Sequence, residues 1–493
     1  MMIMFIKATP ESVGISSKQI LKYLKMINFH ELSSHSVLIA RGDKIICEAY
    51  WKPFDKNTRH RMYSQTKSYV GLAVRLLANE GKISLDDKII SYFPDKLPDE
   101  IHPYLAELSI RNMLMMRTCF DDYGVNWFTA KTDDRVKLYF SQKPSVYPGT
   151  QFNYDSFGSF VLGALVERLT GKTFLEYLNE KCLLKIGFSG TAYCLKCPGG
   201  YAWGDSALIC TPRDMLLYGR FIGRRGKING KQIIPAEIID EAFADGTDNC
   251  SCGFRTFQSC GYASQFWRFY GNSVGFDGMH DQFTVYDPDT DITFTCTSGN
   301  YRSHDSGQLI MSYLFSEIIG TAGDALEENP DDYRELQNYI ENLSLVSASG
   351  NKTSASESEI DGKIFIAEEN KAGITRFSFN FSEKECKFNY RNEQGDKTLI
   401  LGRCENIFQQ FPQTGYSGEI GGTDCENHTY KCAGSFAWKT ENQLYIKVQI
   451  IDEYIGNLYI CFSFRNGKGR MKMVGDAENF LREYNGSINA EIE

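Results

Sequence analysis

The sequence predicts two structural parts, an α+β domain that fills the first two thirds of the chain and an all-β domain after it. Strand-like alternation lies near both ends of the first part, with helical patterns between, and period-2 alternation dominates the end of the chain. A Ser/Asn/Lys-rich stretch separates them. We therefore expect a first domain over 1–330, a helix and linker over 331–360, and a barrel or sandwich over 361–493.

Apolar periodicity and turn residues place the elements of the first domain. Residues 36–50 alternate around a Gly-Asp turn, which predicts a hairpin. Residues 64–80 are apolar nearly all round at helical spacing, which predicts a buried helix ending at Gly81. Paired strands are expected over 283–298, and further helices over 157–170, 174–184, 212–224, 234–243, 305–319 and 331–343.

The last part of the chain alternates apolar and polar residues, as in ITRFSFNFS, ECKFNYR, QLYIKVQII, NLYICFSFR and GRMKMVG. Turns are expected at 392–395 and at Asn466-Gly467, so the pattern predicts a β-meander, closed as a small barrel or packed as a sandwich. No cluster of residues there suggests chemistry. We expect a role in packing or assembly; the alternative is a lid or rim that shapes the substrate cleft.

Composition excludes several function classes. The 493 residues carry a net charge of −9 and no basic run, which disfavours nucleic acid and anionic membrane as partners. No apolar run approaches a membrane span, and the chain start does not resemble a secretory signal. The odd count of 15 cysteines fits a reducing cytoplasm. Cys194 and Cys197 lack a second pair of matching spacing, so we expect no metal and no cofactor.

The pattern Ser-x-x-Lys occurs twice, at Ser64 and Lys67 and again at Ser349 and Lys352. The second copy lies in the polar linker. The first opens the predicted buried helix, where residues three apart face the same way. A serine hydroxyl needs a base to attack, and a lysine whose pKa is lowered by burial can be that base. On these residues alone, a helix-start serine and a snorkelling lysine remain the alternative.

Three segments carry further motifs: MYSQTKSYVGLAVRLLANEGKISLDDKI, YPGTQFNYDSFGSFVLGALVERLTGKTFLEYL and YAWGDSALICTPRDM. In this order they resemble the serine β-lactamase and penicillin-binding-protein superfamily, in particular its class C-related esterase and 6-aminohexanoate-dimer hydrolase branch. The resemblance covers about residues 8–320. It implies a β-lactamase/transpeptidase-like domain, with an antiparallel sheet flanked by helices. Within the third segment, Thr211 and Pro212 predict a structural helix start.

The resemblance also implies roles for individual residues. Ser64 would be the nucleophile, Lys67 the general base, and Tyr154 the relay that moves protons to and from the serine and the leaving group. A phenol with an ordinary pKa near 10 can share a proton with an amine of similar pKa. Ser156 stands where penicillin-recognising members have asparagine, and this Tyr-x-Ser form resembles the esterase branch.

The strand expected beside the site departs from the family pattern. Where β-lactamases carry Lys-Thr-Gly or His-x-Gly, this chain has Phe276-Asp277-Gly278. The missing cation contacts the carboxylate of penicillin-type substrates, which counts against β-lactamase and DD-peptidase activity. Gly278 permits close backbone approach, and the N–H groups of Met279 and Ser64 are expected to form an oxyanion hole. His280 either lines the pocket or is a hydrogen-bonded structural histidine.

These observations predict a cytoplasmic serine hydrolase that cleaves a small-molecule ester, amide or peptide through an acyl-enzyme on Ser64. A β-lactamase or a D-aminopeptidase/DD-peptidase is the alternative within the enzymes. An acyltransferase would share every residue named above. A catalytically weak binding protein on the same fold is the alternative outside catalysis.

Overall fold

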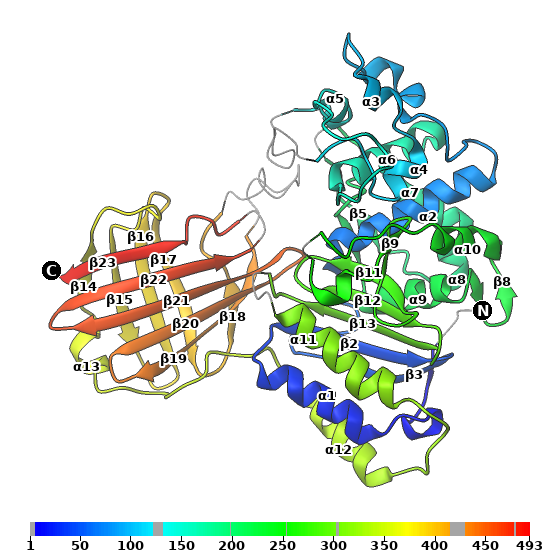
Figure 1. Cartoon of the computed structure of the whole chain (residues 1–493). Coiled ribbons are helices and arrows are strands. Elements are labelled where there is room, and N and C mark those ends of the chain that lie inside the picture. The colour runs from blue at the N-terminus through cyan, green and yellow to red at the C-terminus, as the bar shows by residue number, and fades with distance from the viewer. Residues whose placement is uncertain are drawn as a thin grey trace. The chain divides into compact units, whose positions relative to one another are not determined.

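The computed structural model describes residues 5–121, 132–197, 199–252, 254–301, 305–414, 429–477 and 480–493. The chain divides into two compact units, drawn in Figure 1. The first unit comprises 1–30, 34–298 and 304–344, and the second comprises 31–33, 299–303 and 345–493.

The segment expected as a separate helix and linker is divided between the two units. Its helix, α12 (Pro330–Glu341), belongs to the first unit because its buried Leu336 side lies against α1 (Ser17–Phe29). The boundary follows Ser344, so the rest of the segment belongs to the second unit.

A sheet of eight strands, counted over the described residues, forms the centre of the first unit. Its order is β1-β3-β2-β13-β12-β11-β10-β9, and every pairing except that of the β1 edge strand is antiparallel. The strands are β1 (Ile6–Lys7), β2 (Ser34–Arg41), β3 (Lys44–Tyr50), β9 (Tyr262–Ala263), β10 (Phe266–Arg268), β11 (Val274–Gly278), β12 (Gln282–Asp287) and β13 (Ile292–Ser298).

Helices cover both faces of this sheet, because its side chains alternate between two buried faces. On one face, α9 (Pro212–Gly223) lies so close that a Cβ at Gly219 would come within 3.3 Å of Thr293. On the other face, Tyr23 of α1 packs edge-on against Phe294, with 6.0 Å between ring centroids. Figure 1 shows α1, α11 (Ser306–Tyr313) and α12 together on that side.

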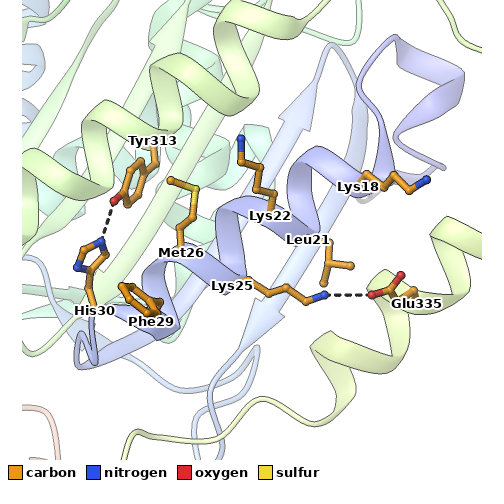
Figure 2. Close-up of a pocket in the computed structure, with 9 residues that line it drawn as sticks. All are labelled: Lys18, Leu21, Lys22, Lys25, Met26, Phe29, His30, Tyr313 and Glu335. Carbon is orange, nitrogen blue, oxygen red and sulfur yellow. Dashed lines mark hydrogen bonds and ion pairs between the residues drawn. The ribbon is translucent and has the colours of Figure 1, made fainter.

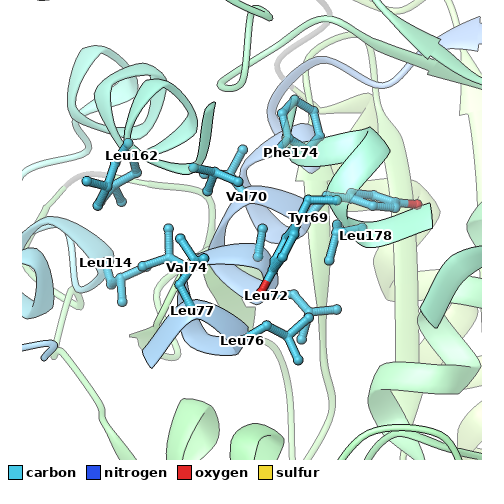
Figure 3. Packing of buried hydrophobic residues seen from close by; sticks show 14 of the residues in the cluster. Tyr69, Val70, Leu72, Val74, Leu76, Leu77, Leu114, Leu162, Phe174 and Leu178 are labelled. Atoms are coloured by element: carbon cyan, nitrogen blue, oxygen red, sulfur yellow. The ribbon is translucent and has the colours of Figure 1, made fainter. Parts of the chain in front are cut away.

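The buried helix expected over 64–80 is confirmed. It begins as a 3₁₀ turn, Tyr63–Gln65, and continues as α2 (Thr66–Asn79), in which every residue from Thr66 to Leu77 is buried. Figure 3 shows its apolar side chains among those of the surrounding helices. Gly204 packs closely against Val70 of α2 and against Gly163, since a Cβ at Gly204 would lie 3.1 Å from Val70 Cγ2 and 3.3 Å from Gly163 Cα.

Helices lie where they are expected over 157–170, 212–224 and 234–243, and two expected helices are interrupted. The helix expected over 174–184 is broken by a π-helical turn at Asn179–Leu183 between α7 (Phe174–Leu178) and α8 (Leu184–Ile186). The helix expected over 305–319 is α11 followed by a π-helical turn at Leu314–Ile318. Thr211 caps α9 with Pro212 in its first turn, as its sequence predicts. The α-helices not yet given with their bounds, over the described residues, are α3 (Pro103–Ala106), α4 (Ile110–Leu114), α5 (Arg135–Phe140), α6 (Ser156–Thr170), α10 (Ala236–Ala244) and, in the second unit, α13 (Glu357–Ile360).

The second unit is a closed barrel, which decides between the two expected forms of the meander. Its strands, over the described residues, follow the order β17-β16-β15-β14-β23-β22-β21-β20-β19-β18, and an added β17–β19 pairing closes the ring. Rings from non-adjacent strands meet inside it, as Phe377 and Phe462 do at 5.4 Å. The strands are β14 (Ile364–Ala367), β15 (Arg376–Phe381), β16 (Glu385–Asn392), β17 (Gly395–Arg403), β18 (Ile407–Gln410), β19 (Lys431–Thr440), β20 (Gln443–Ile451), β21 (Ile455–Arg465), β22 (Lys468–Asp476) and β23 (Gly486–Ile492).

Within the described part of the chain, no helix combines the length and the apolar character needed to cross a bilayer.

Candidate active site

Ser64 lies at the entry to α2, on a segment that is held from both sides. Met62 N–H donates to Leu208 O at 2.8 Å, and Leu208 N–H donates to Thr66 Oγ1 at 3.1 Å. Tyr63 has a φ of 46°, in the left-handed region that non-glycine residues rarely adopt. Such backbone strain persists where the surroundings enforce it. This conformation of Tyr63 sets the direction of the chain immediately before the half-buried Ser64.

The structure brings together Ser64, Lys67 and Tyr154. Lys67 Nζ donates to Ser64 Oγ at 2.8 Å and to Asp205 O at 2.8 Å, and the lysine is 1% exposed. The same Nζ lies 5.1 Å from the centroid of the Tyr154 ring. Burial raises the pKa of the Tyr154 phenol well above its usual range, and a hydrogen bond with Ser64 opposes that rise. A hydroxyl, an amine and a phenol therefore lie close together in one polar site.

Gly278, at the end of β11, approaches the backbone at the start of this helix. A Cβ at Gly278 would lie 2.2 Å from Met62 O and 3.3 Å from Ser64 N. Any other residue would push the strand away from the nucleophile. Met279, the next residue, is partly exposed. The oxyanion hole expected from the N–H groups of Ser64 and Met279 stays a prediction.

His280 and Ser156 lie at the edges of this arrangement. His280 is 2% exposed, and its ring lies 5.0 Å from that of Tyr63. Its backbone O accepts a hydrogen bond from Gln282 Nε2 at 2.9 Å. His280 is therefore buried against Tyr63, and its role, as a pocket-lining or a structural residue, stays a prediction. Ser156 is the half-buried first residue of α6, next to the capping residue Asp155.

Asp205 is a polar residue of the site that sequence reasoning missed. Its side chain is fully buried, and burial raises its pKa to about 7, while the charges of Lys67, Arg61 and Arg135 act in the opposite direction. The two guanidinium groups lie 5.3 Å and 4.7 Å from the ring of Trp203. The sequence signal that could have revealed Asp205 is its charge within the mostly apolar segment YAWGDSALIC.

Asp277 is a second buried carboxylate, and the charge of Lys67 acts on it. Burial raises its pKa to about 7, and the charges of Arg255 and Lys67 lower it. Its side-chain oxygen accepts a hydrogen bond from the amide of Gln258. Asp277 was recognised in the sequence only as part of the departing Phe276-Asp277-Gly278 motif, without a role of its own.

A large open groove lies elsewhere in the first unit, along α1 (Figure 2). It encloses about 810 Å³, and none of the predicted site residues lines it. Its cationic side chains are already matched by acidic neighbours, as in the 3.0 Å pair between Lys25 and Glu335. Among the described residues, no cluster of three His, Cys, Asp or Glu side chains is arranged to hold a metal ion.

Comparison with known proteins gives one family match. The model of the family described as Beta-lactamase matches residues 26–308. A 6-aminohexanoate-dimer hydrolase of Paenarthrobacter ureafaciens is 26% identical over 281 residues, which are 53% of this chain and 71% of that protein.

Solved structures share the fold at low sequence identity. An octameric penicillin-binding protein homologue from Pyrococcus abyssi is 15% identical, with a TM-score of 0.51, over 96% of this chain and 99% of the other. A D-amino acid amidase from Ochrobactrum anthropi SV3 is 14% identical, with a TM-score of 0.50, over 62% of this chain and 99% of the other. Both parts of the chain thus have counterparts in a known architecture.

Proposed function

Because the chain belongs to the beta-lactamase family, we propose that it is a serine hydrolase that cleaves a small ester or amide through an acyl-enzyme on Ser64. The observation that carries the proposal is the 2.8 Å contact between Lys67 Nζ and Ser64 Oγ at a buried helix start. The relative named 6-aminohexanoate-dimer hydrolase supports hydrolysis as the reaction class.

Acylation begins when the substrate carbonyl oxygen enters the hole formed by the N–H groups of Ser64 and Met279. Lys67, as the neutral amine, removes the Ser64 proton as Oγ attacks the carbonyl carbon. The two N–H groups stabilise the tetrahedral oxyanion. The leaving group departs with a proton delivered through Tyr154, which lies beside the lysine. Water then attacks the acyl ester on Ser64 while the same amine and phenol take its proton, and a proton returns to Ser64 Oγ as the acid product is released.

Asp205 affects the charge on Lys67 without touching the substrate. A carboxylate near the amine favours the ammonium form, whereas Arg61 and Arg135 disfavour it. Because the pKa of Asp205 is raised to about 7, its own charge varies near neutrality. Lys67 and Asp205 therefore titrate as a pair, and a pH profile reports the pair.

Penicillin-type substrates fit this site poorly. Phe276 occupies the place where the family carries a cation, and its ring packs against Tyr218 at 5.2 Å in the core. A substrate carboxylate would meet Asp277 there instead of a lysine. We therefore rank β-lactamase and DD-peptidase activity below hydrolysis of simple esters and amides.

The test is hydrolysis of p-nitrophenyl butyrate by the wild type, Ser64→Ala and Ser349→Ala. Ser349 belongs to the second Ser-x-x-Lys copy and provides a matched control. We expect an early burst from the wild type and from Ser349→Ala, and no turnover by Ser64→Ala. Equal rates for the wild type and Ser64→Ala would overturn the mechanism. Added alcohol acceptors distinguish transfer from hydrolysis, since only a transferase forms new esters in preference to free acid.

A further inference from the structure

The loop that carries Met279 is short and joins strands β11 and β12. Gly278 pairs with Gln282 across the ladder, and residues 279–281 form the connection between them. His280 has a φ of 63° and Asp281 a φ of 58°, two successive left-handed conformations without a glycine. Each such residue costs free energy and persists only where its surroundings hold it. The conformation of this loop therefore depends on its anchors.

The side chain of Asp281 anchors the loop from outside the two strands. It is 2% exposed and forms an ion pair with Arg255 Nη1 at 3.1 Å. The hydroxyl of Ser306, the first residue of α11, donates to the other carboxylate oxygen. A Cβ at Gly307 would lie 2.7 Å from Asp281 Oδ1, so α11 can approach the carboxylate because a glycine follows Ser306.

The segment that carries Arg255 also holds the strand on the other side of Met279. Gln258 donates from its side-chain amide to the Asp277 carboxylate. The backbone N–H of Gln258 donates to Arg255 O at 2.9 Å and closes the 3₁₀ turn Thr256–Gln258. One turn of chain therefore binds the residue two positions before Met279 and the residue two positions after it.

The Met279 N–H is a donor that the fold leaves unused. Among the residues that the structure describes, no hydrogen bond involves this N–H. Met279 directly follows Gly278, where a Cβ would lie 3.3 Å from Ser64 N. The Met279 N–H is therefore available to a ligand at the end of the strand that abuts Ser64.

We propose that Asp281, held by Arg255 and Ser306, is a positioning residue that fixes the Met279 N–H where a substrate carbonyl oxygen develops its negative charge. The inference rests on the proposed function, because that oxyanion forms only if Ser64 attacks a carbonyl. Asp281 acts through the backbone of its loop. An oxyanion donor must stand in place before the reaction, and a displacement of about 1 Å costs roughly a hundredfold in rate.

The charge of the ion pair makes this anchor sensitive to the loss of one partner. Removing Arg255 would take away the cation, and a buried carboxylate that loses its cation is strongly destabilised. The loop can relieve this by moving Asp281 toward water, which displaces Met279 as well. Loss of the Ser306 hydroxyl removes one neutral donor and should displace the loop less.

Affinity for butylboronic acid measures the oxyanion site without requiring turnover. Ser64 Oγ would add to boron and pass its proton to Lys67, which leaves a tetrahedral anion with a hydroxyl oxygen in the oxyanion position. Calorimetric titration compares the wild type with Arg255→Met, Arg255→Lys and Ser306→Ala. Glu48→Gln is the matched control, because it removes a 2.6 Å ion pair with Arg213 elsewhere in the first unit.

The expected order of affinities follows from the size of each loss. Arg255→Met should bind the boronic acid roughly 10–100-fold more weakly than the wild type, and Ser306→Ala roughly 3–10-fold more weakly. Arg255→Lys should recover most of the affinity, because it restores the cation. Glu48→Gln should bind like the wild type. Wild-type affinity in both Arg255→Met and Ser306→Ala overturns the proposal, and so does an equal loss in Glu48→Gln.

Steady-state kinetics with p-nitrophenyl butyrate give a readout that a purely structural role would not move. Rates are normalised to the folded fraction, which urea unfolding of each variant measures. Arg255→Met should lower kcat by roughly 10–100-fold and change KM by less than about threefold, because only the transition state carries the oxyanion. A normalised kcat equal to that of the wild type contradicts the positioning role.

Ser64→Ala separates failure of this inference from failure of the proposed function. This variant should not bind the boronic acid measurably. Binding that survives in Ser64→Ala, or that is absent from the wild type, contradicts the acyl-enzyme and the inference with it. Binding that requires Ser64 and is unaffected by the loss of Arg255 and Ser306 contradicts only the role of Asp281.

Discussion

The two Ser-x-x-Lys copies share a spacing and differ in everything else. Lys67 is 1% exposed, with its amine shared between Ser64 Oγ and a backbone carbonyl at 2.8 Å each. Lys352 is exposed, and Ser349 Oγ accepts its hydrogen bond from Lys439 at 3.1 Å. Only the first pair stands at a helix start, where residues three apart face one another.

This difference shows what a catalytic motif requires beyond its letters. A lysine in water remains an ammonium and cannot accept a proton near neutrality. Burial disfavours the charged form, and only a tertiary environment that also positions the serine can use that effect.

Replacing each serine gives the sharpest contrast. Ser64→Ala should lower kcat/KM for p-nitrophenyl butyrate by roughly a thousandfold or more, because no nucleophile remains. Ser349→Ala should change it by less than about twofold, since this half-buried residue belongs to the second unit and lies outside the Ser64 site. Steady-state kinetics of both variants measure this. Comparable losses in the two would show that the copies do not differ in function.

Replacing each lysine tests the base. Lys67→Met should slow acylation by roughly 10²–10⁴-fold, the range for loss of a general base. Lys352→Met should leave the burst rate unchanged. Burst amplitudes and rates with p-nitrophenyl butyrate measure the acylation step directly. Normal acylation in Lys67→Met would assign the proton transfer to another group.

Gly278→Ala tests the close approach beside Ser64. The new Cβ would lie 2.2 Å from Met62 O, so either strand β11 or the start of α2 must move. We expect a loss of about 1–3 kcal/mol in unfolding free energy and roughly 10–100-fold in kcat. Gly190→Ala is the control, because nothing lies within 4 Å of its Cβ position. Urea unfolding and initial rates measure both effects; equal behaviour of the two variants would argue against a constrained oxyanion hole.

Asp205→Asn tests the buried carboxylate of the residue whose backbone oxygen accepts a hydrogen bond from Lys67. The folded-state pKa of about 7 exceeds the ordinary value of 3.8, so the folded state binds more protons between these values. Stability therefore falls as pH rises through that window. The asparagine variant should lose part of this dependence, by about 1 kcal/mol, and the acid limb of kcat/KM should move to lower pH.

The measurement for Asp205 is urea unfolding at several pH values, with Asp289→Asn as the exposed control. An unchanged slope in Asp205→Asn would mean that this carboxylate titrates normally. A shift of the acid limb to higher pH would mean that Asp205 does not favour the ammonium form of Lys67.

Local features of the chain were readable from the sequence. Capping of α9 by Thr211 with Pro212, the buried α2 and the period-2 strands each depend on residues within a few positions of one another. The order of the motifs indicated the family and the β-lactamase/transpeptidase-like fold, and both are confirmed. The roles of Ser64, Lys67 and Tyr154 stay predictions.

Features that depend on contacts between residues far apart in the sequence were decided only by the tertiary structure. Barrel closure depends on pairing between β17 and β19, and the raised pKa values of Asp205 and Asp277 depend on burial by several elements. The π-helical turn at Asn179–Leu183 and the burial of His280 also lacked a local pattern. The sequence by itself therefore determined periodicity, capping and motif order. The fold alone determined which polar groups lose water and meet, because desolvation is a property of the whole packed environment.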